Sequence, residues 1–184
     1  MLPPDHVLRR ATLSDLSALE ALIALSARTL GARDYSAAQI EGALRGAFGV
    51  DTQLIRDGTY FVVEHSGQLV GCGGWSRRRT LFGSDARPDR DASELDPSQD
   101  AAKIRAFFVH PDFARCGIGD SILEQCEQEA MAKGFTRFEL MATLPGIKFY
   151  ATHGYAAGEP IKWPLGAGLT IDFLPMAKRM PDTI

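Results

Sequence analysis

One segment in the second half of the chain constrains the fold most, because it joins an apolar stretch to an amphipathic one through a glycine-containing turn. KIRAFFVH at 103–110 has the character of a buried strand, and Pro111 ends it. The loop ARCGIGD at 114–120 follows. Apolar residues then recur at helical spacing from 118 to 130, and Gly134 is a suitable stop. The order predicts a strand, a tight turn and a helix.

Such a turn is suited to bind a pyrophosphate. The first N–H groups of a helix have no partner within the helix, and this end of the helix has partial positive charge. Gly117 and Gly119 have no Cβ, so a phosphate can approach the main chain closely. Arg115 can add a charge-assisted contact. Taken alone, two glycines in a loop are equally consistent with a plain tight turn.

Two better-known phosphate motifs are excluded. The sequence has no G-x-x-x-x-G-K-[ST], so it is not a P-loop protein. The third glycine of a dinucleotide-binding G-x-G-x-x-G is also missing, because Ile122 stands in its place.

The remaining pattern predicts one α+β domain over residues 1–184, without repeats or a dividing linker. Ser14 and Ser36 are candidate N-caps of two helices near the start of the chain. The glycines at 71, 73 and 74 indicate a bulge or a close backbone approach within a strand. Strands are expected at 7–12, 59–65, 68–79, 103–110, 136–143, 155–165 and 168–179, and helices at 14–30, 36–47, 118–130 and 146–153.

Composition excludes several classes of protein. The net charge of −3 does not suggest a general affinity for nucleic acid. The longest strongly apolar run, at 21–25, is too short to span a bilayer, and we expect no membrane association. Neither a signal peptide nor metal-ligand spacing is seen, and free thiols are the simplest interpretation of the three cysteines. We therefore expect a cytoplasmic protein without a metal.

Residues 85–100 differ from the rest of the chain. The segment has six acids against two arginines and is broken by prolines, which predicts an acidic surface loop. A solvated loop is the favoured interpretation. The alternative is an acidic rim that attracts a cationic amine.

The wider stretch around the glycine turn closely resembles the GNAT (GCN5-related N-acetyltransferase) superfamily. The resemblance lies in FFVHPDFARCGIGDSILEQCEQEAMAKGFTRFEL at 107–140 and in FYATHGY at 149–155. The family pattern Q/R-x-x-G-x-G/A is matched at Gly117 and Gly119, while Ala114 occupies the first basic position and Arg115 follows it.

The resemblance implies a GNAT fold, in which a mixed and largely antiparallel sheet flanked by helices is splayed where acetyl-CoA inserts. It implies a cofactor core over 103–155 and acetyl-CoA as co-substrate. The amides of the pantetheine arm would pair with the exposed edge of the 103–109 strand. A backbone N–H near Phe108 or Val109 would stabilise the oxyanion. The cofactor-binding residues implied are Phe108, Val109, Arg115, Cys116, Gly117, Ile118, Gly119, Asp120 and Ser121.

The resemblance also implies direct attack of an amine on the thioester, with Tyr150 as the acid that protonates the departing thiolate. The alternative for Tyr150 is aromatic packing. The general base is left unassigned, with His110, Glu64 and a water chain as candidates, and Lys103 stands where the family sometimes has a glutamate. A covalent role for Cys116 is disfavoured.

The expected function is therefore N-acetyl transfer from acetyl-CoA to a primary amine. Its acceptor, a small molecule or a peptide, is open, and so is the oligomeric state, for which a homodimer is one arrangement. A catalytically idle acyl-CoA sensor or a small interaction module is the alternative.

Overall fold

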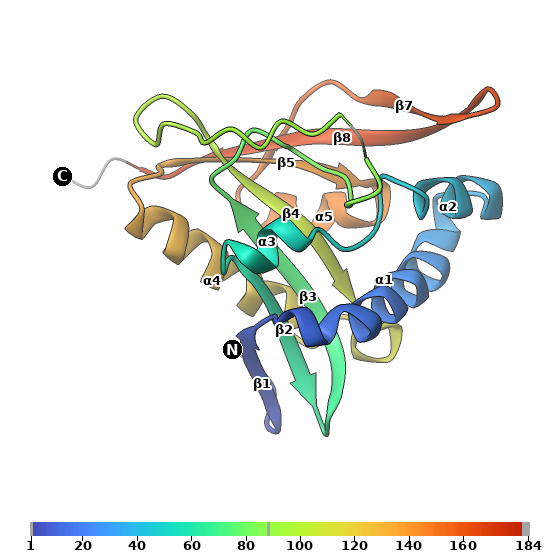
Figure 1. The fold of residues 1–184 in the computed structure, drawn as a ribbon, viewed down its shortest axis with the longest axis horizontal. Coiled ribbons are helices and arrows are strands. Elements are labelled where there is room, and N and C mark those ends of the chain that lie inside the picture. Colours follow the sequence, from blue (N-terminus) through green and yellow to red (C-terminus); the bar gives the residue numbers. More distant parts are fainter. Residues whose placement is uncertain (1, 88, 182–184) are drawn as a thin grey trace.

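The structure, a computed structural model, describes residues 2–87 and 89–181. Figure 1 shows helices on both sides of one twisted sheet. The helices are α1 (Leu16–Leu30), α2 (Ala37–Ala43), α3 (Thr52–Arg56), α4 (Ile118–Ala132) and α5 (Ile147–Thr152). The strands are β1 (His6–Arg10), β2 (Tyr60–His65), β3 (Gln68–Ser76), β4 (Ala102–Val109), β5 (Arg137–Thr143), β6 (Ala156–Ala157), β7 (Ile161–Gly166) and β8 (Leu169–Arg179). This is the predicted single-domain α+β fold with a mixed sheet.

The sheet is divided at its centre. Its order is β1-β2-β3-β4-β5-β8-β6, with β7 on β8, and every pairing is antiparallel except β4 with β5. Those two parallel strands pair through only two positions, Ala102 with Phe138 and Lys103 with Glu139. Beyond them the strands separate, so the rest of β4 has an edge without a strand partner.

Two apolar clusters cover the two faces of the sheet. One lies beneath α4 and includes Ile118, Phe138 and Tyr150. The other lies beneath α1 and α2 and includes Leu19 and Phe173. Because side chains alternate along a strand, β4 contributes to both clusters and forms a wall between them.

The β2–β3 hairpin explains the glycines predicted to mark a bulge. Its turn is Ser66–Gly67, and both residues have positive φ, +49° and +78°, as a two-residue type I′ turn requires. A Cβ on Gly71 would lie 2.3 Å from Ile118 of α4. A Cβ on Gly73 would lie 2.6 Å from Phe107, opposite an irregularity in β3–β4 pairing. These glycines therefore allow close packing at a bulge.

The expected element boundaries need five corrections. Helix α1 is preceded by a 3-10 turn that begins after Thr12, not Ser14, because Asp15 accepts the Thr12 N–H at 2.8 Å. Ser36 does cap α2, accepting from the Gln39 N–H at 3.2 Å, but α2 ends at Ala43. Helix α3 was not expected. Strand β3 ends at Ser76, and the strand expected at 155–165 is two strands, β6 and β7.

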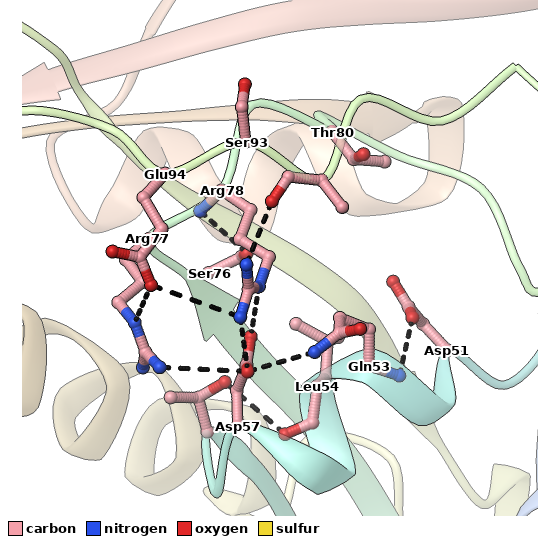
Figure 2. A network of polar contacts seen from close by, with 12 residues as sticks. Asp51, Gln53, Leu54, Asp57, Ser76, Arg77, Arg78, Thr80, Ser93 and Glu94 are labelled. Atoms are coloured by element: carbon pink, nitrogen blue, oxygen red, sulfur yellow. Dashed lines mark hydrogen bonds and ion pairs between the residues drawn. The ribbon is translucent and has the colours of Figure 1, made fainter.

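The acidic segment is mainly exposed but firmly anchored. Figure 2 shows the buried carboxylate of Asp57, at the end of α3, accepting two hydrogen bonds from the Arg78 guanidinium. Their lengths are 2.7 and 2.9 Å. Arg78 also donates to the Ala92 carbonyl at 2.9 Å, and Arg77 lies 3.3 Å from Glu94. Leu95, within the segment, is buried in the apolar cluster beneath α4. The basic run that follows β3 thus holds the segment against α3.

No helix in the described part of the chain has the length and apolar character needed to cross a membrane. The three cysteines are free, as expected.

Candidate functional site

A cavity of about 730 Å³ opens where β4 and β5 separate. It passes from one face of the sheet to the other. On the α4 face it is lined by the loop before α4 and by α5, and on the α1 face by α1 and the aromatic cluster beneath it. One continuous space therefore connects the predicted cofactor loop with the opposite side of the sheet.

Strand β4 is bent at the middle of this cavity. Ala106 and Phe107 stand opposite the single residue Gly73, and Ala106 has φ of +56°. The buried Tyr60 hydroxyl holds the bend by donating to the Ala106 carbonyl at 3.0 Å. Beyond the bend, Phe107 faces the α4 cluster and Phe108 faces the α1 cluster.

The backbone of Val109 faces the open side of β4. The His110 N–H donates to the Val70 carbonyl at 2.9 Å, which makes Val70–His110 a hydrogen-bonded pair of the antiparallel ladder. Such pairs alternate along the ladder, so the N–H of Phe108 is directed toward β3 and that of Val109 toward the splayed edge. Of the two expected oxyanion donors, Val109 is the better oriented.

The glycine turn presents free N–H groups at the same cavity. Gly117 is the N-cap of α4 with φ of +79°, a left-handed conformation that suits glycine. The first intrahelical bond runs from the Ser121 N–H to the Gly117 carbonyl at 3.1 Å. The N–H groups of residues 118–120 therefore have no partner within the helix. This arrangement fits the pyrophosphate of coenzyme A.

Charged side chains surround this turn. Arg115 and Lys148 both line the cavity and both are exposed. Asp120 lines it too, but its carboxylate is 3.0 Å from Nε2 of His153, at the end of α5. That contact directs the one acidic side chain of the turn toward an imidazole and leaves its backbone N–H available.

Tyr150 borders the cavity from the α4 face. Its ring packs against Phe107, Phe149 and Tyr155 with centroids 6.2, 5.0 and 5.8 Å apart. Only 8% of the residue is exposed. Burial raises the pKa of the Tyr150 hydroxyl well above its ordinary value, with a smaller contribution from Cys126. The hydroxyl is protonated at neutral pH, as an ordinary phenol is, and burial makes it a weaker acid.

Most of the predicted cofactor residues meet at this cavity. Those that line it are Phe108, Val109, Arg115, Gly117, Ile118, Gly119 and Asp120. Two do not. Cys116 is exposed outside the lining, and the N–H of Ser121 is used by the helix. Neither candidate base residue lines the cavity. Glu64 instead forms an ion pair with Arg9 at 3.1 Å, and His110 accepts from the Asp112 N–H at 3.2 Å.

The structure adds residues that sequence reasoning missed. Gly146, Lys148 and Phe149 border the cavity immediately before Tyr150, and Thr143 does so at the end of β5. A Cβ on Gly119 would lie 3.2 Å from the Phe149 ring, so the two segments pack closely. The proximity of Lys148 to Tyr150 in the sequence was the available signal.

Comparisons with known proteins agree with this geometry. The model of the acetyltransferase (GNAT) family matches residues 27–155. A GCN5-related N-acetyltransferase from Rhodopseudomonas palustris has a TM-score of 0.71 at 20% identity, covering 98% of this chain and 99% of that one. PaiA N-acetyltransferase from Thermoplasma acidophilum, solved with coenzyme A, gives 0.64 at 16%, covering 95% and 98%. Ribosomal-protein-alanine N-acetyltransferase from Brucella melitensis gives 0.62 at 21%, covering 95% and 99%.

At these identities the structural likeness establishes the fold alone, and no curated protein sequence matches the chain. The family model, however, spans well over half of the chain. It includes the splayed strand, the glycine turn and the segment of Tyr150. The chain belongs to the GNAT acetyltransferase family.

Proposed function

We propose that the protein is an N-acetyltransferase that transfers the acetyl group of acetyl-CoA to an amine by direct attack. The observation that supports this most is the meeting, at one cavity, of the unpaired β4 edge, the free N-terminus of α4 and the hydroxyl-bearing ring of Tyr150. Three separate segments converge there, and each has a different task in acyl transfer.

The α4 end of the cavity would bind the phosphates. Backbone N–H groups of residues 118–120 point outward from the helix, and Arg115 and Lys148 add positive charge beside them. The edge of β4 that β5 leaves unpaired supplies donors and acceptors at the spacing of an added strand, which suits the two amides of the pantetheine arm.

When bound, acetyl-CoA supplies an activated acyl thioester. The Val109 N–H, directed to the open edge of β4, stabilises the negative charge that develops on the thioester oxygen. Tyr150 holds a proton at its hydroxyl oxygen and delivers it to the departing sulfur. The surrounding apolar rings exclude water from this point.

The cysteines support direct attack over a covalent route. Burial raises the pKa of the Cys72 thiol to about 12 and that of the Cys126 thiol well above its ordinary value, so neither is a ready nucleophile. Cys116 is exposed and lies outside the cavity lining. The amine nitrogen itself is then the nucleophile.

The test measures binding and chemistry separately. Isothermal titration with acetyl-CoA and with CoA, together with the rise in Tm that each produces, tests the cofactor site. Release of free thiol from acetyl-CoA in the presence of an amine panel, with mass spectrometry of the acetylated product, tests the transfer. Binding without amine-dependent thiol release would identify an idle sensor, and no binding of either ligand would reject the proposal.

A further inference from the structure

The half of the cavity on the α1 face is walled by aromatic rings. The ring centroid of Phe108 of β4 lies 5.9 Å from that of Phe48. The Phe48 centroid lies 6.1 Å from that of Phe173 of β8. Phe173 in turn lies 5.6 Å from Phe82. All four residues line the cavity. The rings meet at tilted and edge-on angles and form a continuous apolar surface across the sheet from the cofactor turn.

This half of the cavity has no side chain that would neutralise a cation. Among the described residues that line it, none is an aspartate, glutamate or histidine, and the one acidic lining residue, Asp120, belongs to the cofactor turn. The Tyr35 hydroxyl is fully engaged, donating to the Asp172 carbonyl at 2.7 Å and accepting from the Leu144 N–H at 2.9 Å. Ser26 and Thr143 are neutral.

The charged group in this wall is itself a cation. Arg105 of β4 is 5% exposed and lines the cavity. One of its terminal nitrogens lies 2.7 Å from Asp51 and the other donates to the Gly83 carbonyl at 2.6 Å. Asp51 also binds Arg90 at 2.9 Å and does not line the cavity. The carboxylate behind the wall is thus already paired with two arginines and is not directed at the cavity as a free counter-charge.

The acidic segment does not supply the missing charge. None of its described residues lines the cavity, and four of its acids are paired with arginines: Asp85 with Arg90, Asp89 with Arg87, Glu94 with Arg77 and Asp100 with Arg79, at 2.9–3.7 Å. The segment is therefore not an acidic rim at the acceptor half.

We propose that the acceptor is an aromatic amine, whose nitrogen lone pair is delocalised into the ring and which is therefore uncharged near neutral pH. The inference rests on the proposed function. Burying an ammonium group without a counter-charge is costly, and only the neutral amine is a nucleophile. An aromatic amine enters in its reactive form and needs no carboxylate to deprotonate it, which matches a site that offers none. Its ring packs edge-on against Phe82, Phe108 and their neighbours.

The reaction then balances without a further reactant. The nitrogen lone pair forms a bond to the thioester carbonyl carbon, and the carbon–sulfur bond breaks with its electron pair on sulfur. The sulfur takes the proton of the Tyr150 hydroxyl. The nitrogen loses one of its two protons, which restores that hydroxyl directly or through water. The products are an aryl amide and free CoA.

The direct test compares aniline with cyclohexylamine, which has the same number of carbon atoms but is protonated at neutral pH. Spermidine serves as a polycationic probe. With acetyl-CoA saturating, we expect kcat/KM for aniline at pH 7.5 to exceed that for either other amine at least about tenfold, as tenfold follows from about 1.4 kcal/mol of unfavourable ammonium burial. Calorimetry with the CoA complex should detect binding of aniline and not of spermidine.

A charge introduced at the wall sharpens the test. Leu30, the last residue of α1, is half-buried and lines the cavity. Leu30→Glu should raise kcat/KM for cyclohexylamine relative to aniline by about tenfold, because the new carboxylate pairs with the ammonium group and can accept the proton that it must lose before attack. Leu30→Gln has the same length without the charge, so it reports the loss of apolar surface alone and should not raise cyclohexylamine turnover.

The outcomes separate this inference from the proposed function. Thiol release with cyclohexylamine or spermidine equal to or above that with aniline overturns the acceptor class and leaves the acetyltransferase intact. Binding of acetyl-CoA with neither turnover nor binding of aniline also overturns it. Failure to bind acetyl-CoA rejects the proposed function itself.

Discussion

The two halves of the cavity differ in how the chain builds them. The α4 half comes from two short segments, 107–120 and 143–152, with backbone groups at its centre. The α1 half is assembled from 26–35, 47–49, 82–83 and Phe173 together with Arg105 and Phe108 of β4, with side chains at its centre. One half is local in sequence, and the other exists only after the sheet and helices have packed.

This difference separates what the two halves recognise. Backbone N–H groups at a helix terminus bind any pyrophosphate, so the α4 half suits a ligand shared by a whole family. Ring positions and the absence of a counter-charge depend on side chains drawn from distant segments. Because the two halves are built from different groups, we expect variants in the two halves to affect different constants.

The largest expected effect is on chemistry at the boundary between the halves. Tyr150→Phe keeps the ring and its packing but removes the proton donor. A general acid usually contributes about 100- to 10,000-fold, and water can replace part of this, so kcat should fall at least about tenfold. The Kd for acetyl-CoA should stay near wild type. Steady-state kinetics under conditions where chemistry limits the rate provide the measurement.

Tyr155→Phe is the matched control. Its ring lies 5.8 Å from Tyr150, but its hydroxyl donates to Glu127 at 2.8 Å and it does not line the cavity. The control should cost about 1 kcal/mol of stability and leave kcat unchanged. A Tyr150→Phe enzyme with wild-type kcat would leave Tyr150 as a packing residue.

The next effect tests whether the α4 half depends on backbone conformation. Gly117→Ala places a Cβ at φ of +79°, and relief of about 1–2 kcal/mol of strain would turn the N–H groups away, weakening acetyl-CoA binding about tenfold. Gly134→Ala, at the other end of α4 with φ of +91°, incurs similar strain far from the turn. Equal Kd values for the two variants, measured by calorimetry, would contradict the backbone mechanism.

A smaller effect is expected for the side chain beside that turn. Arg115 is exposed, so Arg115→Ala should weaken acetyl-CoA binding only about two- to fivefold, since exposed ion pairs contribute about 0–1 kcal/mol. The effect should shrink further at high salt. Lys133→Ala, an exposed charge at the far end of α4, is the control. A loss greater than that of Gly117→Ala would make the side chain the dominant phosphate ligand.

The sequence predicted the local half well and the assembled half hardly at all. The strand, the turn at 114–120 and α4 follow from apolar periodicity and from glycines at positions that need them. Tyr150 was placed at the cavity through the family resemblance. Phe48, Phe82 and Phe173 are far apart in the chain, and no local pattern distinguishes a ring that lines a cavity from one that fills a core.

The sequence predicted element boundaries wrongly where tertiary contacts decide them. Helix α3 is only five residues long and begins at a cap, Asp51, whose carboxylate also binds Arg90 and Arg105 from distant segments. The long strand expected at 155–165 is divided at residues 158–160, because these three residues lie opposite only two residues of β8, 174 and 175. Such tertiary contacts are invisible to periodicity.

The smallest effect is expected from loosening the contacts that anchor the acidic segment. We expect it to change the binding of the acceptor and not that of acetyl-CoA. Arg78→Met removes the clamp between Asp57 and the Ala92 carbonyl (Figure 2) but keeps an apolar stem. Phe82 lies between Arg78 and the segment in the sequence and lines the cavity, so loosening the clamp should raise the acceptor KM about two- to threefold, while the Kd for acetyl-CoA stays unchanged. Arg78 holds the pKa of the Asp57 carboxyl below its ordinary value. A lowered folded-state pKa means that this contribution to stability is present above the unfolded value, about 4, and is lost as pH falls through the folded value. As pH falls from about 5 through the folded-state pKa of Asp57, the free energy of unfolding of the wild type should therefore decrease faster than that of Arg78→Met. Denaturant titrations at a series of pH values measure this. Parallel pH profiles for the two proteins would show that the clamp does not stabilise the segment, and a changed acetyl-CoA Kd would show that the two halves are coupled.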